Sequence, residues 1–545
     1  MPTAALCPRP SSPTGRAFKV ARIALLSRVI VIVLAVLSNL FVDDYDSSFD
    51  LVYDTSHTRT YSPNWSKMPL TDGPSANLVR LTPLNPVSTS PDGNSHSDPR
   101  LPEPPDTMAS HLRQSTGTIS ATDDHFNHDP APLRYWLKPW LRVFVRWDAI
   151  YFVHLAEEGH YIYEQEHAFF PMLPMLMRFF ATYVLFPLIP ALGYRITIIL
   201  AGILVSNAAF VGSAVALYQL GCEVVGNTSL AYLAALCYCF TPSNVFMSAI
   251  YTESLFALFS FVCLRLVARR RYLTAAYFVF LSSLTRSNAI TYCGFFLYDF
   301  LVRPLRRVRP QLSWLVGYLW GSFRAVFYCL VALSGLALFQ VYGYQLYCTS
   351  PLVDRPWCHH RIPLMYNFVQ SHYWNNGFLK YYELKQIPNF LFASPMVILS
   401  FAGIISYARY DWLRFLTVGL WQGAPSDLIQ RSSGTTTTTP PPSPATRKTE
   451  VSPYFRESLL PHVYLWLVML LYTLLNMHVQ IITRFFSSQP LVYWYSAHLF
   501  LQSDQTAASS RKGQRLTGSA TCLLYYYSLY GFIGVVLFSN FFPPA

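Results

Sequence analysis

The chain has 545 residues, of which 52% are hydrophobic and only 12% are charged. Soluble domains are less apolar and carry about twice that share of charge, so the composition excludes a soluble globular protein and predicts an all-α polytopic membrane protein. The formal net charge of +12 does not indicate a nucleic-acid partner, because the basic residues flank hydrophobic runs in the pattern of a topology signal.

The first apolar run, residues 20–42, is long enough to cross a bilayer core of about 30 Å. It has no clear small-residue cleavage site before Asp43, so we predict a retained helix and not a removed signal peptide. The positive-inside rule places residues 1–19 in the cytosol, because five basic residues precede or open the run: Arg9, Arg16, Lys19, Arg22 and Arg28. Residues 43–165 would then face the lumen or the exterior.

Residues 43–130 are rich in Ser, Thr, Pro, Asp and His, and such a segment buries too little apolar surface to fold alone. We predict a disordered luminal insert, in which the acidic clusters at 43–46 and 123–124 are solvated charge and not a metal site. A candidate glycosylation acceptor begins at Asn64, and a second begins at Asn227. We expect both to be luminal.

Residues 131–167 are predicted to form a luminal catalytic loop that presents Asp148. When residues 141–155 are projected as a helix, six apolar or aromatic side chains fall within about 60° of Asp148, and the neighbouring charges do not. Such a face can tune a carboxylate as a general base, since burial disfavours the charged form unless a cation or hydrogen bonds compensate. The alternative interpretation is a helix cap or an ion pair with a nearby arginine.

Residues 168–407 contain the main membrane bundle. Four apolar runs are clean: 168–190, 194–219, 324–347 and 389–407. Two longer stretches are interrupted by polar residues, 229–268 at Thr241-Pro242-Ser243-Asn244 and 272–302 at Thr285-Arg286-Ser287-Asn288. We interpret 229–268 as one broken crossing, which keeps Arg269, Arg270 and Arg271 in the cytosol, and 272–302 as a segment that returns to the same side. With later runs at 458–477 and 522–541, about eight to ten spans are predicted.

Arg286 interrupts an apolar segment, where an unpaired arginine costs at least about 2.5 kcal/mol. It is a candidate contact for a phosphate, and the alternative is an ion pair with Glu253; the two interpretations are compatible. Arg484 is a similar candidate of lower weight, because it lies at a predicted helix end, where snorkelling to the interface is an ordinary explanation.

The luminal loop predicted at 348–388 holds Cys348 and Cys358. They are candidates for a disulfide, since that compartment is oxidising. His359 and His360 are adjacent but have no further ligands nearby, so we interpret them as loop residues and predict no metal site. The aromatic and polar stretch 373–386 is typical both of sugar-binding surfaces and of interfacial aromatic belts.

Residues 408–457 are predicted to form a cytosolic low-complexity loop, and 458–545 to form C-terminal membrane helices with a luminal loop at 478–520. Four blocks dense in aromatic and polar residues remain, and we expect them to converge: 140–171, 241–256, 356–388 and 476–499. The sequence contains no phosphate-binding glycine loop, no H-E-x-x-H and no G-x-S-x-G motif. These absences argue against a protein driven by nucleotide hydrolysis.

Several stretches form a recognisable set: Arg146-Trp147-Asp148 with Tyr151-Phe152, Ala168-Phe169-Phe170-Pro171, SAIYTESLF at 248–256, Thr285-Arg286-Ser287-Asn288, YYELKQIPNF at 381–390, and 478–487 followed by 493–498. Together they resemble the second-step mannosyltransferases of glycosylphosphatidylinositol (GPI) anchor synthesis, the GPI mannosyltransferase 2 or PIG-V family. The resemblance implies a GT-C type helix bundle with a large first luminal loop, a multi-pass protein of the endoplasmic reticulum membrane with a luminal active site, and dolichyl phosphate mannose as the donor.

The same resemblance implies that an α-1,6-linked mannose is added to the first mannose of the GPI precursor lipid. Asp148 would be the base for the acceptor 6-hydroxyl, in a single inverting displacement. Arg286 or Arg484 would hold the dolichyl phosphate, and Trp147 would pack beside the base. The remaining substrate-binding candidates are Glu158, Tyr161, Glu164, Asn288, Glu383, Lys385, His478 and Gln480. No cofactor is expected, metal dependence is left open, and an accessory membrane subunit is a candidate partner.

Two other functions stay open on the sequence. Another GT-C transferase of lipid-linked sugars would share this machinery and differ in its acceptor. A non-catalytic lipid flippase or scaffold would use Asp148 and Arg286 as a structural or gating pair. Internal repeats would favour the flippase, and none is seen in the sequence.

Overall fold

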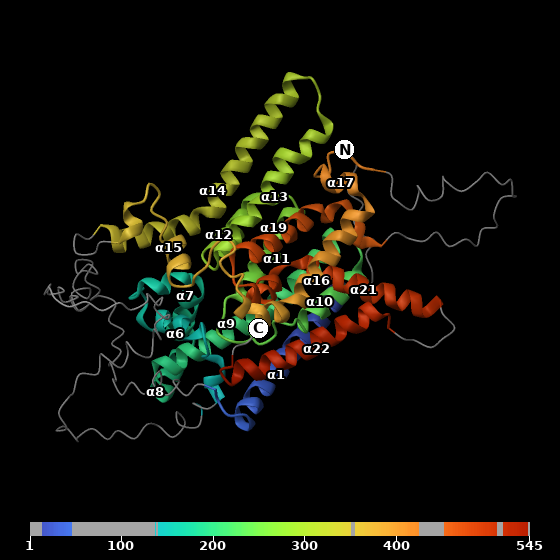
Figure 1. Cartoon of the computed structure of the whole chain (residues 1–545). Coiled ribbons are helices and arrows are strands. Elements are labelled where there is room, and N and C mark those ends of the chain that lie inside the picture. The colour runs from blue at the N-terminus through green and yellow to red at the C-terminus, as the bar shows by residue number, and fades with distance from the viewer. Residues whose placement is uncertain are drawn as a thin grey trace, which may run out of the picture.

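The computed structural model describes residues 13–45, 137, 140–349, 355–423, 452–509 and 516–542. Within these ranges all regular secondary structure is helical (Figure 1), which confirms the all-α polytopic prediction. Among the described residues, six helices are long and apolar enough to cross a membrane: Gly15–Phe41, Tyr194–Val224, Leu312–Cys348, Leu384–Tyr410, Glu457–Asn476 and Gly518–Ser539. The predicted insert at 43–130 and the low-complexity loop at 408–457 fall largely outside the described residues, and Asn64 does so entirely.

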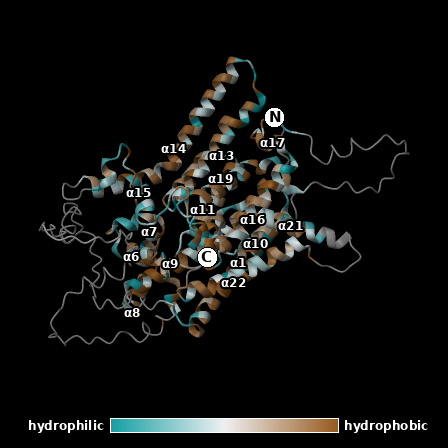
Figure 2. Ribbon diagram, viewed as in Figure 1, coloured by the Kyte–Doolittle hydropathy of each residue, from teal (hydrophilic) through white to brown (hydrophobic). Residues whose placement is uncertain are grey.

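The long helices are α1 (Pro13–Phe41), α9 (Tyr194–Val224), α14 (Leu312–Cys348), α16 (Ile387–Tyr410) and α22 (Gly518–Ser539). α9 packs against α1, α10 and α11, and α1 and α22 lie side by side (Figure 1). The peripheral α14 is mostly hydrophobic along its length (Figure 2) and leaves Phe323, Leu330 and Leu338 exposed. Apolar side chains left outside a packed bundle are what a lipid-facing surface requires.

Residues 141–155 do not form one helix, contrary to the sequence projection. A 3₁₀ turn, η2 (Arg142–Phe144), ends before Trp147, whose φ is +54°, and α6 (Ala149–Glu158) begins just after Asp148. A left-handed residue cannot continue a right-handed helix. Because of the break, Asp148 is the last loop residue before α6 and does not lie on the face of a continuous helix.

The apolar run at 168–190 does not cross the bundle either. After η3 (Glu164–Ala168), it folds into α7 (Met172–Phe179), η4 (Phe180–Val184), η5 (Phe186–Leu188) and α8 (Ile189–Leu192), with a bend of 72° after Val184. The last turn of α7 and the start of α9, which flank the bend, both contact the end of α6: Arg178 donates to the Glu157 carbonyl at 2.8 Å, and Arg195 pairs with the Glu157 carboxylate at 3.4 Å. We call this end of the bundle the α6 end.

The opposite end, which we call the basic end, gathers the ends of several helices. α9 finishes there, and Glu223 in its last turn pairs with Arg265 and Arg269 at 2.8 and 2.6 Å. Arg16, at the start of α1, donates to Thr228 at 3.1 Å. α10 (Thr228–Cys239) therefore starts at the basic end, and α11 (Glu253–Ala268) finishes there.

Two predictions for this region are corrected by that arrangement. Residues 229–268 form a hairpin whose turn, 240–252, lies inside the bundle, and not one broken crossing. The buried Arg28 satisfies this turn by donating to the Asn244 and Cys239 carbonyls and to Ser248, which is why a polar turn is tolerated there. Asn227 lies at the same end of the bundle as Arg16, whereas the sequence had placed the two on opposite sides of the membrane; its side chain caps α10 by accepting from Leu230 N at 2.9 Å.

Residues 272–302 return to the end from which they start, as predicted. α12 (Tyr272–Ser283) leads away from the basic end, and η6 (Ser287–Tyr292), α13 (Cys293–Leu297), η7 (Tyr298–Val302) and η8 (Arg303–Arg307) lead back. Tyr272 at the start donates to Asp299 near the finish at 3.0 Å. The break between the two arms contains Thr285 and Arg286.

The C-terminal part also differs from the prediction, because 478–520 is not a loop. α16 is followed by α17 (Trp412–Leu416), η11 (Pro453–Phe455), η12 (Glu457–Leu459) and α19 (Leu460–Asn476). After η13 (Val479–Ile481), α20 (Ile482–Phe485) and η14 (Phe486–Ser488), α21 (Pro490–Ser509) runs to the basic end, where His498 hydrogen-bonds Ser452 at 2.8 Å. α22 then returns, and Asn540 donates to Ser38 at 2.8 Å. Apolar run length alone had not revealed α21.

A segment at 355–376 closes the α6 end. It contains η9 (Pro356–His359) and α15 (Met365–His372), and η10 (Leu384–Gln386) follows it. Cys358 forms a disulfide with Cys348 at the end of α14, so the predicted pair is present. Glu164 of η3 binds this segment, since its carboxylate accepts from Trp357 Nε1 and from the Tyr373 hydroxyl, each at 2.8 Å.

Candidate active site

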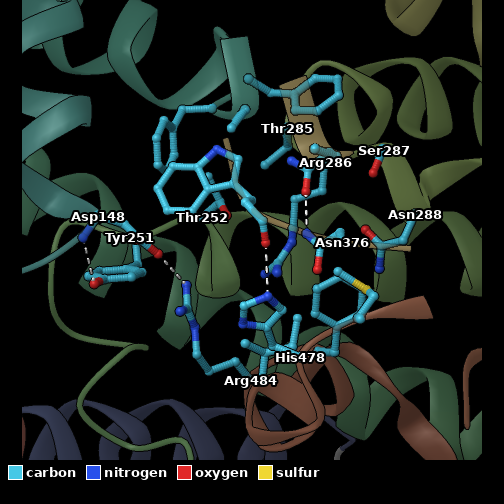
Figure 3. Close-up of a pocket in the computed structure, with 18 of the residues that line it drawn as sticks. Asp148, Tyr251, Thr252, Thr285, Arg286, Ser287, Asn288, Asn376, His478 and Arg484 are labelled. Atoms are coloured by element: carbon cyan, nitrogen blue, oxygen red, sulfur yellow. Dashed lines mark hydrogen bonds and ion pairs between the residues drawn. The ribbon is translucent and has the colours of Figure 1, made fainter. Parts of the chain in front are cut away.

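A cavity of about 320 Å³ lies at the α6 end, inside the bundle (Figure 3). All four blocks that were expected to converge contribute to it, together with the break between α12 and η6. Its walls include Trp147, Asp148, Phe152, Phe169, Phe246, Tyr251, Arg286, Asn288, Tyr366, Gln370, Trp374, Asn376, His478, Gln480 and Arg484. Segments distant in the chain thus build a single site.

Asp148 is fixed to the α10–α11 turn by Tyr251. The Asp148 backbone N–H donates to the Tyr251 hydroxyl at 3.1 Å, and that hydroxyl donates to the Arg146 carbonyl at 3.3 Å. The Asp148 side chain makes no hydrogen bond that caps α6. Since 29% of its surface stays accessible, its carboxylate can meet a molecule that enters the cavity.

Arg484, from α20, binds two carboxylates at once. Its NH2 atom lies 3.0 Å from Asp148 Oδ2, and its Nε atom lies 2.8 Å from Glu253 Oε1 (Figure 3 draws the pair with Asp148). The guanidinium also lies over the rings of Phe246 and Tyr251, at 4.6 and 4.8 Å from their centroids. The side chain points into the bundle, so snorkelling at a helix end is the wrong interpretation of this residue.

Arg286 approaches the same carboxylate from the other side. Its NH1 atom lies 3.2 Å from Glu253 Oε1, and its guanidinium lies 4.6 Å from the centroid of the Phe485 ring. The ion pair proposed as an alternative is therefore present, and Arg286 also lines the cavity. Four charged side chains thus contact one another in series with alternating sign: Asp148, Arg484, Glu253 and Arg286.

Glu253 lies behind the two arginines and is not part of the cavity lining. Its side chain has no accessible surface, and Oε1 receives both guanidinium contacts. Oε2 has no hydrogen-bond partner in the described part of the chain. A buried carboxylate needs compensation by paired cations, and the two arginines supply it.

The rest of the cavity wall combines aromatic faces with amide and indole groups. Among the described residues, the indole N–H groups of Trp147 and Trp374 and the Oδ1 atoms of Asn288 and Asn376 have no hydrogen-bond partner. Aromatic faces flanked by unused donors and acceptors suit a hydroxylated ring ligand. Sequence reasoning had not singled out Trp374 or Asn376, although both belong to the mixed stretch 373–386.

His478 is a neutral member of this wall. Its Nε2 atom hydrogen-bonds the Trp374 carbonyl at 2.9 Å, and burial lowers the pKa of His478 below its usual value of 6.5. Neutral imidazole adds no positive charge beside the arginines, so its contribution here is hydrogen bonding and packing. Gln480 is held nearby, where it accepts from the Tyr381 hydroxyl at 3.2 Å.

Five predicted substrate-binding residues lie outside the cavity lining: Glu158, Tyr161, Glu164, Glu383 and Lys385. Tyr161 is buried and donates to the Phe169 carbonyl at 2.7 Å. Glu164 supports the 355–376 segment, and Glu383 and Lys385 pair with each other at 2.6 Å near the surface. Local sequence cannot show that a polar residue beside a site faces away from it.

No group of three or more His, Cys, Asp or Glu side chains suited to a metal ion occurs within the described residues. The charged groups of the cavity are the two arginines and Asp148. Such a site can bind an anion through the guanidinium groups and can accept a proton at a carboxylate.

The family to which the chain belongs follows from its sequence relatives. The sequence profile of the mannosyltransferase family described as Mannosyltransferase (PIG-V) matches residues 125–545. The chain belongs to the PIG-V mannosyltransferase family. The match includes every residue that lines the cavity.

Individual relatives agree with the PIG-V assignment. The chain is 33% identical over 463 residues to GPI alpha-1,6-mannosyltransferase 2 of Homo sapiens, covering 73% of this chain and 86% of the relative. It is 32% identical over 411 residues to GPI mannosyltransferase 2 of Schizosaccharomyces pombe, covering 74% and 73%. A solved oligosaccharyltransferase of Archaeoglobus fulgidus superposes with a TM-score of 0.36 and 12% identity, over 69% of this chain and 48% of that one.

As a PIG-V family member, the chain is a membrane-embedded mannosyltransferase, and the flippase or scaffold alternative is no longer needed to explain buried charge. A sugar transferase needs a place for its donor, a place for its acceptor and a group that takes the acceptor proton. The cavity is the site where Asp148 and the two arginines meet.

Proposed function

We propose that this GT-C type enzyme transfers the second mannose, in α-1,6 linkage, from dolichyl phosphate mannose to the GPI precursor lipid in the endoplasmic reticulum. The name of the human relative supports the acceptor and the linkage, and that of the fission-yeast relative supports the acceptor. The observation that carries the proposal is the contact between Asp148 and Arg484 on the cavity wall, because it brings a carboxylate base and an anion-binding cation to one site.

The proposed chemistry is a single displacement. Asp148 removes the proton from the acceptor 6-hydroxyl, whose oxygen attacks the anomeric carbon from the side opposite the phosphate, and the configuration at that carbon inverts. Phosphate is already a good leaving group, so the enzyme has mainly to position the two substrates and stabilise charge. Arg286 and Arg484 are the groups that would hold the phosphate, since both line the cavity.

The sugar would lie against the aromatic and amide wall. Trp147 and Trp374 offer flat faces, and Asn288 and Asn376 offer amide groups with unused acceptors in the described structure. This arrangement assigns sugar contacts to Trp374 and Asn376 in place of Glu158 and Glu164. Whether an accessory membrane subunit is required is answered by the activity of the purified single chain.

We place the α6 end in the lumen. The other end carries a large excess of basic side chains, which favours the cytosol. The basic residues on the helix ends and turns there are Arg16, Lys19, Arg22, Arg265, Arg269, Arg270, Arg271, Arg303, Arg306, Arg307, Arg309, Arg409, Arg414 and Arg456. The few acids near them include Glu223, Asp299, Asp411 and Glu457.

The test compares wild type with Asp148→Asn in cells that lack the second GPI mannose, with accumulated GPI intermediates as the readout. Wild type should restore the species with two mannoses, and the Asn variant should restore less than about 1% as much, since loss of a general base costs 10²–10⁴-fold. Glu157→Gln is the matched control, because it removes a carboxylate that lies outside the cavity and pairs with Arg195.

Two outcomes would contradict the proposal. Full restoration by the Asn variant would reject Asp148 as the base. Failure of correctly located wild-type protein to restore any two-mannose species would reject the acceptor.

A further inference from the structure

Arg484 is the one described residue that forms ion pairs with both Asp148 and Glu253. It uses different nitrogens for the two contacts, Nε toward Glu253 at 2.8 Å and NH2 toward Asp148 at 3.0 Å. The Glu253 contact is completely buried on the carboxylate side, whereas Asp148 keeps 29% of its surface accessible. The guanidinium is therefore anchored at one nitrogen, and its other end faces the cavity.

Arg286 does not share this position. Within the described residues its ion-pair partner is Glu253, at 3.2 Å, although it lines the same cavity. A change in the charge of Asp148 is thus felt by direct contact at Arg484 and not at Arg286.

The proposed reaction moves negative charge from Asp148 to the leaving phosphate. The acceptor oxygen forms a bond to the anomeric carbon, and its proton passes to Asp148, which goes from −1 to 0. The bond between the anomeric carbon and the phosphate oxygen breaks, and its electron pair stays on that oxygen. The phosphate accordingly goes from a diester of charge −1 to a monoester of charge −2. One negative charge leaves Asp148 while one appears on the leaving group.

We propose that Arg484 couples the base to the leaving group: as Asp148 accepts the acceptor proton, Arg484 exchanges its contact with Asp148 for one with the departing phosphate. This inference rests on the proposed function. Glu253 keeps the Nε end in place during the exchange, so the movement is confined to the end of the guanidinium. Before the proton arrives, the contact with Asp148 restrains the free end of the Arg484 guanidinium. Stabilisation of the leaving group would thereby depend on proton removal.

Other groups also face Asp148. Tyr251 lies against it from the α10–α11 turn, and Tyr151 lies near it on α6. Burial raises the pKa of Tyr151, so this phenol stays neutral near pH 7. Arg146 and Arg142 on the preceding turn are directed to Asp44. Within the described residues, the cation that pairs with the Asp148 carboxylate is Arg484.

Asp148→Asn imitates the protonated carboxylate, which makes the exchange measurable as binding. Titration of purified full-length protein with a short-chain prenyl phosphate monoester at pH 7.5, where its second ionisation near pH 6 is largely complete, gives the affinity for the leaving group. The Asn variant should bind this monoester about tenfold more tightly than wild type, because one charge-assisted contact is released to it.

The decisive comparison repeats the Asn substitution in two backgrounds. In Arg484→Gln the gain should disappear, so that D148N/R484Q binds no tighter than R484Q. In Arg286→Gln the gain should remain about tenfold. A gain that persists in the R484Q background would show general electrostatic relief and overturn the coupling, as would the absence of any gain in Asp148→Asn itself.

Arg484→Lys keeps the comparison informative if the Gln variant does not fold. A single ammonium group cannot anchor at Glu253 and also reach Asp148 with separate nitrogens, so the gain should fall below about threefold; a full tenfold gain in the Lys background would overturn the proposal. Failure is separable from failure of the proposed function. If Asp148→Asn retains transferase activity, the base assignment is wrong; if it is inactive but shows no gain in binding, only the coupling is wrong.

Discussion

Glu253 is the residue on which the geometry of both arginines depends. Its Oε1 atom lies within 3.2 Å of a nitrogen of each, and no solvent reaches the side chain. Two cations held by one carboxylate would repel each other without it. The residue lies outside the cavity and acts by positioning Arg286 and Arg484, so its loss should affect binding of the anion without removing any group that touches substrate.

Glu253→Gln is therefore expected to lower kcat/KM about 100-fold, since a small misplacement of catalytic groups has effects of that size. Leaving buried guanidinium groups without their shared carboxylate should also lower the free energy of unfolding by about 3 kcal/mol. Steady-state kinetics and thermal unfolding of detergent-purified protein measure both effects. Glu157→Gln, at a partly exposed pair, should change stability by less than about 1 kcal/mol. Kinetics equal to wild type in the Glu253 variant would mean that other contacts hold the arginines.

His167 offers a test of pH-dependent stability outside the membrane helices. It is buried among aromatic rings in η3, and burial lowers its pKa to about 4. The unfolded chain binds a proton near pH 6.5, whereas the folded chain does not until about pH 4. The stability that neutral His167 contributes is hence complete above pH 6.5 and is lost as the pH falls toward 4.

His167→Phe should weaken this pH dependence. The ring packs near Tyr161 and Phe339, and the Nε2 atom has no partner in the described structure, so an apolar ring should be accepted. We expect the fall in Tm between pH 7 and pH 5 to be smaller in the variant than in wild type, by the equivalent of about 1–2 kcal/mol. Identical pH profiles would show that His167 does not govern this dependence.

At the scale of single residues, the sequence indicated Asp148, Arg286 and Arg484 because charge in apolar surroundings is conspicuous anywhere in a chain. It did not reveal their partners. Arg484 and Asp148 are 336 positions apart, and Arg484 and Glu253 are 231 apart. Polar residues such as Glu164 and Tyr161, which sit beside the site in sequence, instead support the wall from behind.

At the scale of elements, the 355–376 segment contributes Tyr366, Gln370, Trp374 and Asn376 to the cavity. It is attached by the disulfide of Cys358 to Cys348 and by the Glu164 contacts to Trp357 and Tyr373. Both attachments keep α15 against η3. The wall that we assign to sugar contacts therefore depends on links made at its edges.

Replacing both Cys348 and Cys358 by Ser should loosen this wall. A bridge between positions 10 apart in sequence contributes about 2–3 kcal/mol by the loop-entropy estimate. We expect KM to rise about three- to tenfold, with a smaller change in kcat, because Asp148 and the arginines are carried by other elements. Cys522→Ser, at an exposed free cysteine, is the control. A variant with unchanged KM would show that the Glu164 contacts suffice.

Long apolar elements were predictable because length and hydrophobicity are local properties. Six predicted runs correspond to long helices. Breaks and turns were not predictable, because tertiary contacts with residues distant in sequence stabilise them. Two examples are the left-handed backbone at Trp147 and the turn at 240–252, where Arg28 donates to backbone carbonyls. The apolar α7–α8 run likewise looks like a span until its 72° bend is seen.

At the scale of the whole molecule, these local differences change how many times the chain passes between the two ends. Between residue 168 and Arg269 the sequence predicted three passages, whereas the structure makes one full passage, α9, flanked by the bent α7–α8 unit and the α10–α11 hairpin. One and three are both odd, so the chain reaches Arg269 at the same end of the bundle in either case. The basic clusters at 269–271, 303–309 and 409–414 were for that reason predicted to share one end of the bundle, as they do in the structure. Asn227 lies between the two differences, and it was predicted to lie at the opposite end from Arg16 although the two share an end.

The parity changes again after α19, because α21 and α22 make two passages where one was predicted. Consequently α22 finishes at the α6 end, where Tyr45 N donates to the Asn540 carbonyl at 2.9 Å. If that end is luminal, an acceptor sequence for N-glycosylation added after Ala545 on a flexible spacer should be modified. The natural Asn227 acceptor, at the basic end, should not.

Endoglycosidase-sensitive mobility on gels measures both expectations in a background that carries Asn64→Gln. The tagged protein should shift after digestion, Asn227→Gln should leave its mobility unchanged, and the same acceptor cassette placed between Arg307 and Arg309 should stay unmodified. Modification at the Arg307 position without modification after Ala545 would invert the assignment of the two ends and move the cavity to the cytosol. Modification at neither position would contradict the luminal placement of the end of α22, because the cassette after Ala545 must then be shielded or cytosolic. Acceptors placed at several distances from Ser539 distinguish a shielded cassette from a cytosolic one.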